Sequence, residues 1–326
     1  MKPPFYLLAL TSALLHAQGG SLTPPPGSPA PTMKSLDQVE ARTPLVEGAA
    51  GVTIDPITGG ITISESGSFF LAGNLSVTKG NGITINADNV SLDLNGFAIS
   101  SAATPAAGDG IFSSNSHLTI SKGRIIGDYS ISEMDGSGFQ NGINATAGNG
   151  IAISRISVSK CSGNGIRLST GSDRITTTEA CQVDSMGGDG IHANTVKDCL
   201  VTKCTTGGIK GSHVSGSEAA TTGGIGIQAP HVDNCYARSQ DGNGIDSEHV
   251  VNSTGRSTNA TGIDAHNVSQ CTGTSFNGDG ISALYLVTHS QGTSYGNAPG
   301  TFGIKTDTAI GCFTNKLSAD HKFNMP

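Results

Sequence analysis

The sequence predicts an all-β protein built as a single-stranded parallel β-helix, a solenoid in which the chain winds through stacked coils. Three observations support this prediction: a phrase that repeats every 18 residues, a composition typical of strands and tight turns, and small or apolar residues at fixed places in each repeat. The repeat is the strongest of the three, because consecutive units at a fixed period are the signature of stacked architectures.

The composition favours strands over helices. The 326 residues include 46 glycines and no tryptophan, and aromatic residues make up only 5% of the chain. Charged residues account for 13%, compared with about 25% in ordinary globular proteins. Abundant Gly, Ser, Thr, Asn and Ile are typical of strands and turns. The net charge of -7 and the absence of a basic patch predict that nucleic acid is not a partner.

The repeat is anchored by Gly-Ile pairs that follow one another in strict register. With the glycine as position 1, position 4 is always small, position 7 is always aliphatic and ends at Leu286, and position 10 alternates Cys with Ser before ending at His289. Positions 2 and 4 share one face of a strand, so the step from 4 to 7 requires a corner at positions 5 and 6. The six glycines, each 18 residues after the last, are Gly190, Gly208, Gly226, Gly244, Gly262 and Gly280.

A second corner is predicted just before each new glycine. Pairs such as Gly242-Asn243 and Gly278-Asp279 suit a backbone with positive φ. One coil buries apolar groups worth roughly 3–6 kcal/mol, whereas ordering its backbone costs roughly 1–2 kcal/mol per residue, so coils must stack to be stable. Position 14 is polar in all six repeats and position 8 in most of them, where a left-handed hexapeptide coil would need aliphatic residues. We therefore expect a right-handed solenoid with 18-residue coils in its C-terminal half.

The N-terminal segment predicts an exported protein. One lysine precedes an apolar run from Phe5 to Leu15, which is too short to cross a bilayer and is typical of a secretory signal peptide. We expect a secreted or cell-surface protein with no transmembrane anchor after signal removal. The predicted divisions are a signal peptide at 1–17, a Pro-rich linker with a short N-terminal segment at 18–45, and a β-helix at 46–326, divided into irregular coils at 46–187, regular coils at 188–297 and a final coil and cap at 298–326.

Particular phrases carry a family resemblance. The stretch "SGSFFLAGNLSVTKGNGITINADNVSLDLNGFAIS" at 66–100, the recurrent "GI-x-A-x-N-V-x-x-C" and the ending "NKLSADHKFNMP" resemble secreted bacterial right-handed parallel β-helix proteins of the pectin-lyase-like superfamily with PbH1-type repeats. The resemblance spans nearly the whole chain. It implies the fold, and a functional range from polysaccharide lyases, hydrolases and esterases to adhesins and tail spikes. The motifs Asn-Thr-Asp, Asp-Asp, Gly-His-Gly and Arg-Ile-Lys of polygalacturonase-like enzymes are absent.

Repetition without a catalytic motif favours a non-catalytic module on the cell surface or in the medium. We expect a glycan-binding, adhesive or structural role, with an extracellular polysaccharide or another surface protein as the partner. One alternative is a polysaccharide lyase or glycoside hydrolase that acts from the outer face of the helix. Another alternative is a component of a spike or fibre assembly.

The outer face of two adjacent repeats carries acidic residues. Positions 3 and 5, which point away from the core, hold Asp246 and Glu248 in one repeat and Asp264 and His266 in the next. Equivalent residues on stacked strands lie about 4.8 Å apart. Such carboxylates could bind Ca²⁺ or form the catalytic pair of a retaining glycosidase. The alternative interpretation is a solvated acidic face.

Position 6 carries a run of histidines. His213, His231 and His249 occupy it in three successive repeats, and Tyr285 ends the series. The favoured interpretation is a structural ladder at a polar corner. The alternative is a transition-metal site in which two adjacent imidazoles share an ion.

The cysteines also follow the repeat. Cys199, Cys235 and Cys271 stand in every second repeat, about 9.6 Å apart if strands are stacked, which is too far for a disulfide. We expect them to be buried column residues. Cys181 lies before the strict register, and a bridge becomes geometrically possible only if it stacks on Cys199.

Overall fold

The computed structural model describes residues 42–133, 136–296 and 299–324. The predicted signal peptide and all but the last four residues of the predicted linker lie outside these ranges. Residues 42–326 belong to one compact unit. Its described residues form 32 strands and no helix, so none of these residues provides a helix able to cross a membrane.

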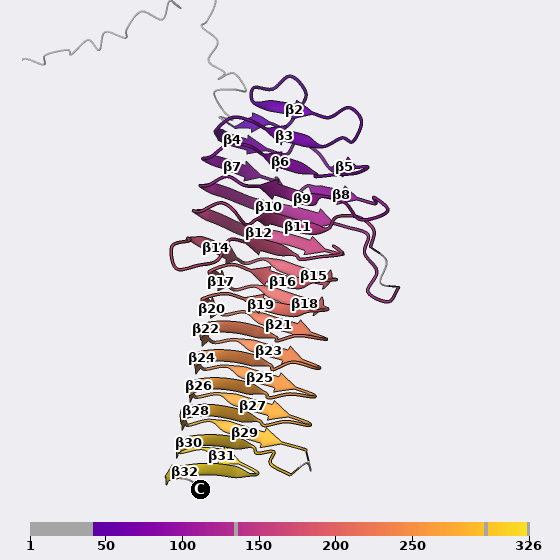
Figure 1. Cartoon of the computed structure of the whole chain (residues 1–326). Helices are drawn as coiled ribbons and strands as arrows, with labels where there is room; N and C mark the ends of the chain where they lie inside the picture. Colours follow the sequence, from indigo (N-terminus) through magenta and orange to yellow (C-terminus); the bar gives the residue numbers. More distant parts are fainter. Residues whose placement is uncertain (1–41, 134–135, 297–298, 325–326) are drawn as a thin grey trace, which may run out of the picture. The chain divides into compact units, whose positions relative to one another are not determined.

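The strands stack along the solenoid (Figure 1); β10 and β12 are the longest, and from β22 onward longer strands alternate with shorter ones. The first sixteen are β1 (Thr43–Pro44), β2 (Val52–Ile54), β3 (Ile61–Ile63), β4 (Gly67–Phe70), β5 (Leu75–Val77), β6 (Ile83–Ile85), β7 (Val90–Asp93), β8 (Ala98–Ser101), β9 (Asp109–Ser113), β10 (Leu118–Ile126), β11 (Asn141–Ala145), β12 (Ile151–Ser159), β13 (Ile166–Leu168), β14 (Thr176–Glu179), β15 (Gln182–Met186) and β16 (Asp189–His192). The others are β17 (Thr195–Lys197), β18 (Leu200–Cys204), β19 (Gly207–Lys210), β20 (His213–Ser215), β21 (Glu218–Thr221), β22 (Ile227–Asp233), β23 (Tyr236–Ser239), β24 (Ile245–Val251), β25 (Thr254–Ser257), β26 (Ile263–Ser269), β27 (Thr272–Ser275), β28 (Ile281–Thr288), β29 (Gln291–Ser294), β30 (Ile304–Ile310), β31 (Phe313–Thr314) and β32 (Leu317–Phe323).

The strands pair along three parallel ladders, as expected for a solenoid. The first ladder runs from β3 through β6, β9, β11, β13, β16, β19 and β22 to β32, and the second from β1 through β4, β7, β10, β12, β14, β17 and β20 to β22. The third runs from β5 through β8, β10, β12, β15 and β18 to β31. The pairing of β2 with β3 is antiparallel, and the other described pairings are parallel. From β22 onward one long strand serves both the first and the second ladder.

The first ladder is built on a column of isoleucines. Its members pair in register from β3 to β30, and each is at most 3% exposed. This confirms the predicted inward position 2 and extends it into the irregular region. Two Gly-Ile pairs stand outside this column: Ile151 pairs with Leu118 on the second ladder, and Ile225, after Gly224, precedes β22. The column consists of Ile61, Ile83, Ile111, Ile143, Ile166, Ile191, Ile209, Ile227, Ile245, Ile263, Ile281 and Ile304.

The third ladder carries a column whose side chains become smaller along the chain. After Leu75 in β5 it continues with isoleucine, valine and alanine, and reaches glycine in β25. A Cβ atom added at Gly255 would lie 2.3 Å from the carbonyl oxygen of Gly262, so only glycine fits there. The members are Ile99, Ile125, Val158, Val183, Val201, Ala219, Ala237, Gly255, Gly273 and Gly292.

A column of buried hydroxyls closes the turn after the third ladder. Ser257 Oγ donates to the Gly242 carbonyl at 2.7 Å and accepts from the Ala260 N–H at 2.9 Å. Ser239 and Ser275 make the same two kinds of contact. These residues occupy position 14, and Ser239 and Ser275 are fully buried. Their polarity therefore reflects turn hydrogen bonding rather than exposure.

The two predicted corners have different outcomes. Consecutive exposed residues Glu248 and His249 mark the corner at positions 5 and 6, as predicted. The prediction of positive φ just before each glycine is wrong for Gly242 and Gly278, which do not have it. Positive φ instead recurs at position 9, at residues such as Asn234 and Asn252, with φ of 52° and 50°. Asparagine tolerates this conformation better than most residues.

An inserted residue in β28 corrects three sequence assignments. Ala283 pairs with Ala265, but the register then shifts so that Leu286 pairs with Asn267 and Val287 with Val268. Val287 is therefore the position 7 residue, and Leu286 rather than Tyr285 follows the histidine series. His289 lies at the positive-φ corner. Ser290 occupies position 10 in place of His289, and its hydroxyl accepts a hydrogen bond from the Cys271 N–H. The extra residue leaves Leu284 and Tyr285 50% and 54% exposed.

Candidate functional site

A groove follows the first ladder across its C-terminal strands. Three adjoining hollows make it up: the first two share Lys210 and Gln228, and the second shares Asp246 and His266 with the third. We call the whole feature the long groove. Its floor is a register-paired row of outward side chains, one from each of β19, β22, β24, β26, β28, β30 and β32. The row consists of Lys210, Gln228, Asp246, Asp264, Ser282, Lys305 and Ser318.

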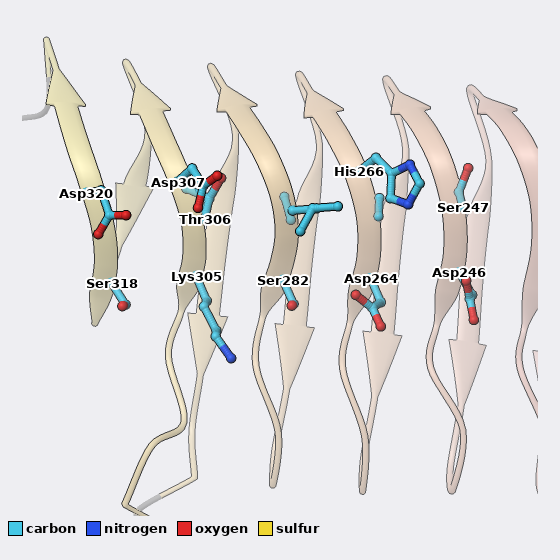
Figure 2. A pocket seen from close by; sticks show the side chains of 13 residues that line it. Asp246, Ser247, Asp264, His266, Ser282, Lys305, Thr306, Asp307, Ser318 and Asp320 are labelled. Atoms are coloured by element: carbon cyan, nitrogen blue, oxygen red, sulfur yellow. The ribbon is translucent and has the colours of Figure 1, made fainter.

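The widest part of the groove, about 500 Å³, lies at its C-terminal end. Figure 2 shows two rows of side chains there, the outward row and a second row that includes His266 on β26, Asp307 on β30 and Asp320 on β32. The lining contains four aspartates and, in Lys305, one lysine. The electrostatic field of this end is therefore predominantly negative at neutral pH.

The structure brings together the two predicted aspartates. Asp246 and Asp264 are Cα partners on β24 and β26. Partial burial, and then repulsion from Asp264, raise the pKa of Asp246. Partial burial also raises the pKa of Asp264, although hydrogen bonds from Asn243 and Ser282 and the charge of Lys305 act in the opposite direction. Both carboxyls therefore hold a proton more readily than solvent-exposed aspartates do.

The register shift in β28 adds an apolar edge to the acidic end. Leu284 lines the groove. Tyr285, beside it, meets the His266 ring edge-on with 5.8 Å between ring centroids. Register irregularities of this kind re-aim side chains and are common next to functional sites. The groove therefore combines acceptors of hydrogen bonds with a nearby exposed aromatic ring.

The predicted calcium ligands are only partly assembled. Asp246 and Asp264 are adjacent, but Glu248 lies on the exposed corner and lines the neighbouring hollow without Asp264. Within the described ranges, no group of three or more His, Cys, Asp or Glu side chains is arranged to hold a metal ion. Weak Ca²⁺ binding at Asp246, Glu248 and Asp264 stays a prediction.

The histidines form the expected ladder. The rings of His213 and His231 stack with centroids 4.8 Å apart, and those of His231 and His249 with centroids 5.4 Å apart. Asn267 Nδ2 continues the ladder at 3.4 Å from His249 Nδ1. The interplanar angles are 23° and 9°. Imidazole lone pairs lie in the ring plane, so nearly parallel rings do not aim them at one ion. This geometry favours the structural interpretation.

Asp93 shows how the same residue type is used structurally. Burial alone would raise its pKa, but hydrogen bonds from Lys122 and from the Asn95 N–H, with the charges of Lys122 and Arg42, hold the pKa below its ordinary value. Its Oδ2 lies 2.8 Å from Arg42 Nη1 and 2.7 Å from Lys122 Nζ. Asp93 is therefore a structural residue, held by cationic side chains from Arg42 and from Lys122 on β10.

The cysteines are buried column residues, as predicted. Cys199, Cys235 and Cys271 are at most 5% exposed, and burial raises the pKa of Cys235 and Cys271 to about 11. Such thiols are almost fully protonated at neutral pH, so we expect them to react with a thiol reagent only after denaturation.

The sequence interpretation missed the C-terminal end of the site. Lys305, Asp307 and Asp320 lie after the strict repeat, and a spacing of 18 residues does not place them beside Asp264. The sequence feature that marks this coil is the Gly303-Ile304 pair, which continues the isoleucine column after an insertion. No family model, curated protein or solved structure matches this chain.

Proposed function

We propose that this protein is a secreted or cell-surface module that binds a linear glycan along the long groove without cleaving it. The observation that carries the proposal is the groove itself, which crosses seven strands of the first ladder. At about 4.8 Å between strands, its floor extends over about 29 Å. A repeating row of polar side chains suits a ligand that itself repeats.

The chemistry of the lining suits sugars. Sugar hydroxyls donate to carboxylates such as Asp264 and Asp246, and hydrogen bonds to charged acceptors are the stronger kind. The apolar C–H face of a sugar ring can pack on an exposed aromatic ring, and Tyr285 beside the groove provides one. Binding sites of this kind pair a few polar groups with apolar contact surface.

The charge of the acidic end selects among glycans. Four aspartates against one lysine repel a polyuronate and attract an amino sugar, while a neutral glycan is unaffected. We therefore propose a neutral or amino-sugar polymer as the ligand. If amino groups contribute, affinity falls as salt is raised, because screening weakens their attraction to the carboxylates.

The proposed fold in full is a right-handed parallel β-helix of the pectin-lyase-like kind with PbH1-type repeats and, in its C-terminal half, 18-residue coils. The pairing of Ile227 with Ile245 and of Ile245 with Ile263 supports this coil length, since each partner stands 18 residues further along. A crystal structure would decide handedness directly.

The test is an oligosaccharide array covering neutral, amino and uronic glycans, read for both binding and turnover. Binding to neutral or amino glycans with no new reducing ends and no unsaturated products supports the proposal. The Asp246→Asn, Asp264→Asn double variant should lose binding, and Glu218→Gln, an exposed acid on the third ladder, should retain it. Failure of all neutral and amino glycans to bind would overturn the proposal.

A glycoside hydrolase is the second candidate, and the raised pKa of Asp246 and Asp264 is the observation that favours it. A general acid must hold its proton near neutral pH, and retaining enzymes place such an acid beside a second carboxylate. New reducing ends released by the native protein, and their loss in the double variant, would establish this activity in place of pure binding.

A further inference from the structure

Two of the seven cysteines are direct neighbours on the third ladder. Gln182 pairs with Leu200, and the Leu200 N–H donates to the Cys181 carbonyl at 2.9 Å. Cys181 and Cys199, each one residue earlier, therefore occupy equivalent places in consecutive coils. Strand spacing of about 4.8 Å falls inside the Cα separation of roughly 4.4–6.8 Å that a disulfide requires.

The two thiols face the same interior space. Cys181 and Cys199 are 0% and 3% exposed, and each Sγ donates to the carbonyl two residues before it, at 3.3 and 3.2 Å. A hydrogen bond between the two thiols lowers the pKa of Cys181 and, together with burial, raises that of Cys199. The paired register thus places both side chains in neighbouring, equivalent positions of the same buried column.

The other five cysteines have no cysteine as the next residue in their column, and all seven lie in the described part of the chain. Ser217 separates Cys199 from Cys235, and its hydroxyl accepts from the Cys199 N–H. Met186 pairs with Cys204, and the N–H of the next residue, Gly187, donates to the Cys161 carbonyl. Met186 therefore lies between Cys161 and Cys204 in their column. The adjacency of Cys181 and Cys199 is therefore specific to this step of the ladder.

We propose that Cys181 and Cys199 form a disulfide when the chain folds in an oxidising medium. With glutathione disulfide as the oxidant, the Cys181 thiolate attacks one glutathione sulfur and releases the first glutathione thiolate. The Cys199 thiolate then attacks the Cys181 sulfur and releases the second. One S–S bond forms, one breaks, and the two thiol protons leave with the two glutathione molecules.

The bond would close one coil where the irregular region, 46–187, meets the regular one. Both sulfurs are buried in the folded chain, so exchange has to take place during folding or in an opened state. A cross-link there restricts the unfolded chain, and we expect it to raise the unfolding midpoint of the oxidised protein above that of the reduced protein. The inference does not depend on glycan binding.

The experiment refolds the denatured, reduced full chain with and without glutathione disulfide, then counts thiols after denaturation and maps non-reduced peptides. The expected result is a fall from seven thiols to five, with residues 181 and 199 in one linked peptide. Serine already occupies the equivalent places at Ser217 and Ser253, so Cys181→Ser should fold and keep its remaining six thiols.

Cys235→Ser is the matched control, because it leaves the pair intact and should still lose two thiols on oxidation. Seven thiols after oxidative refolding of the native chain would overturn the proposal. A linked peptide that joins any other two cysteines, or persistent mixed disulfides with glutathione in place of a linked peptide, would overturn it as well.

Discussion

The irregular region, 46–187, and the regular region, 188–297, fill the same solenoid interior in different ways. In the irregular region the core contains large side chains such as Phe69, Leu92 and Phe139. In the regular region the second-ladder places equivalent to Phe69 and Leu92 hold valines such as Val232 and Val250, and the third ladder holds Ala237 and then glycine. The first ladder hardly changes, because its isoleucines continue through both regions.

Glycines at position 1 show what fills the gap between ladders. A Cβ added at Gly110 would lie 2.3 Å from Ile125 Cγ2, a side-chain atom, whereas one added at Gly244 would lie 2.5 Å from the Arg256 backbone nitrogen. Close packing is kept, but its source changes along the solenoid, from side chains at Gly110 and Gly190 to the backbone at Gly244 and Gly262. An interior made by backbone approach tolerates little variation, because there is no side chain whose size could change.

The outer surfaces of the two regions also differ, in how their aspartates are used. In the irregular region Asp93 is neutralised by Arg42 and Lys122, whereas in the regular region Asp246 and Asp264 share a groove with raised pKa. We infer that interior packing stabilises the coils of the regular region, so that its outward side chains are not needed for stability.

The largest expected effect concerns the column that both regions share. Ile83→Asp and Ile263→Asp should each abolish cooperative folding, and Ile245→Asp should do the same, because each places an unpaired charge in a fully buried column. Thermal unfolding is the measurement. Asp264→Ala, the neighbouring outward residue, should barely change the midpoint, and the reverse ranking would contradict the assigned register.

The next effect compares a substitution that removes side-chain volume in the irregular region with one that adds volume in the regular region. Ile125→Ala should destabilise by about 2–5 kcal/mol, because it leaves a cavity. Gly255→Ala, in the same column, should destabilise by about 1–3 kcal/mol, because the added methyl overpacks against the Gly262 carbonyl. Denaturant unfolding measures both. A neutral Gly255→Ala would show that backbone approach does not set the spacing of the regular region.

A smaller loss is expected at the serine column. Ser257→Ala removes the hydroxyl that serves the Gly242 carbonyl and the Ala260 N–H, and leaving buried groups without partners costs about 1–3 kcal/mol. Thr293→Ala, an outward residue on the same ladder, is the control. Equal effects from the two variants would mean that the buried hydroxyl adds nothing to the turn.

The smallest effect is in pH dependence. A lowered folded-state pKa means that Asp93 stabilises the fold above the ordinary aspartate pKa, and that this stability is lost as pH falls through the folded-state value. The raised pKa of Asp246 and Asp264 has the opposite sign, so these groups reduce stability as pH rises through that range. The measurement is the unfolding midpoint from pH 3 to 7, a range of roughly four units around the reference pKa. In Asp93→Asn the midpoint should depend less on pH at the acid end than it does in the native protein. In Asp264→Asn the midpoint at neutral pH should be slightly higher than in the native protein.

Particular residues show what the sequence could and could not predict. The parallel solenoid and the inward places of Ile245 and Val250 follow from the repeat, because packing in a stack imposes a fixed period. The places of Val287 and Ser290 did not follow, because one inserted residue moves the register without leaving a mark in composition. The aspartate pair was predictable from the period, whereas Lys305 and Asp320 reach the same groove only through pairing after an insertion.

The most direct test of the account compares glycan binding and thermal stability in two sets of variants. We predict that the Asp246→Asn, Asp264→Asn double variant loses glycan binding while its unfolding midpoint at neutral pH is unchanged or slightly raised. Asp93→Asn should lower the midpoint, because it removes the charge that Arg42 and Lys122 neutralise, and leave binding intact at temperatures where it is folded. A double variant that binds glycan normally, or that unfolds as readily as Asp93→Asn, would contradict the separation of structural and groove acids.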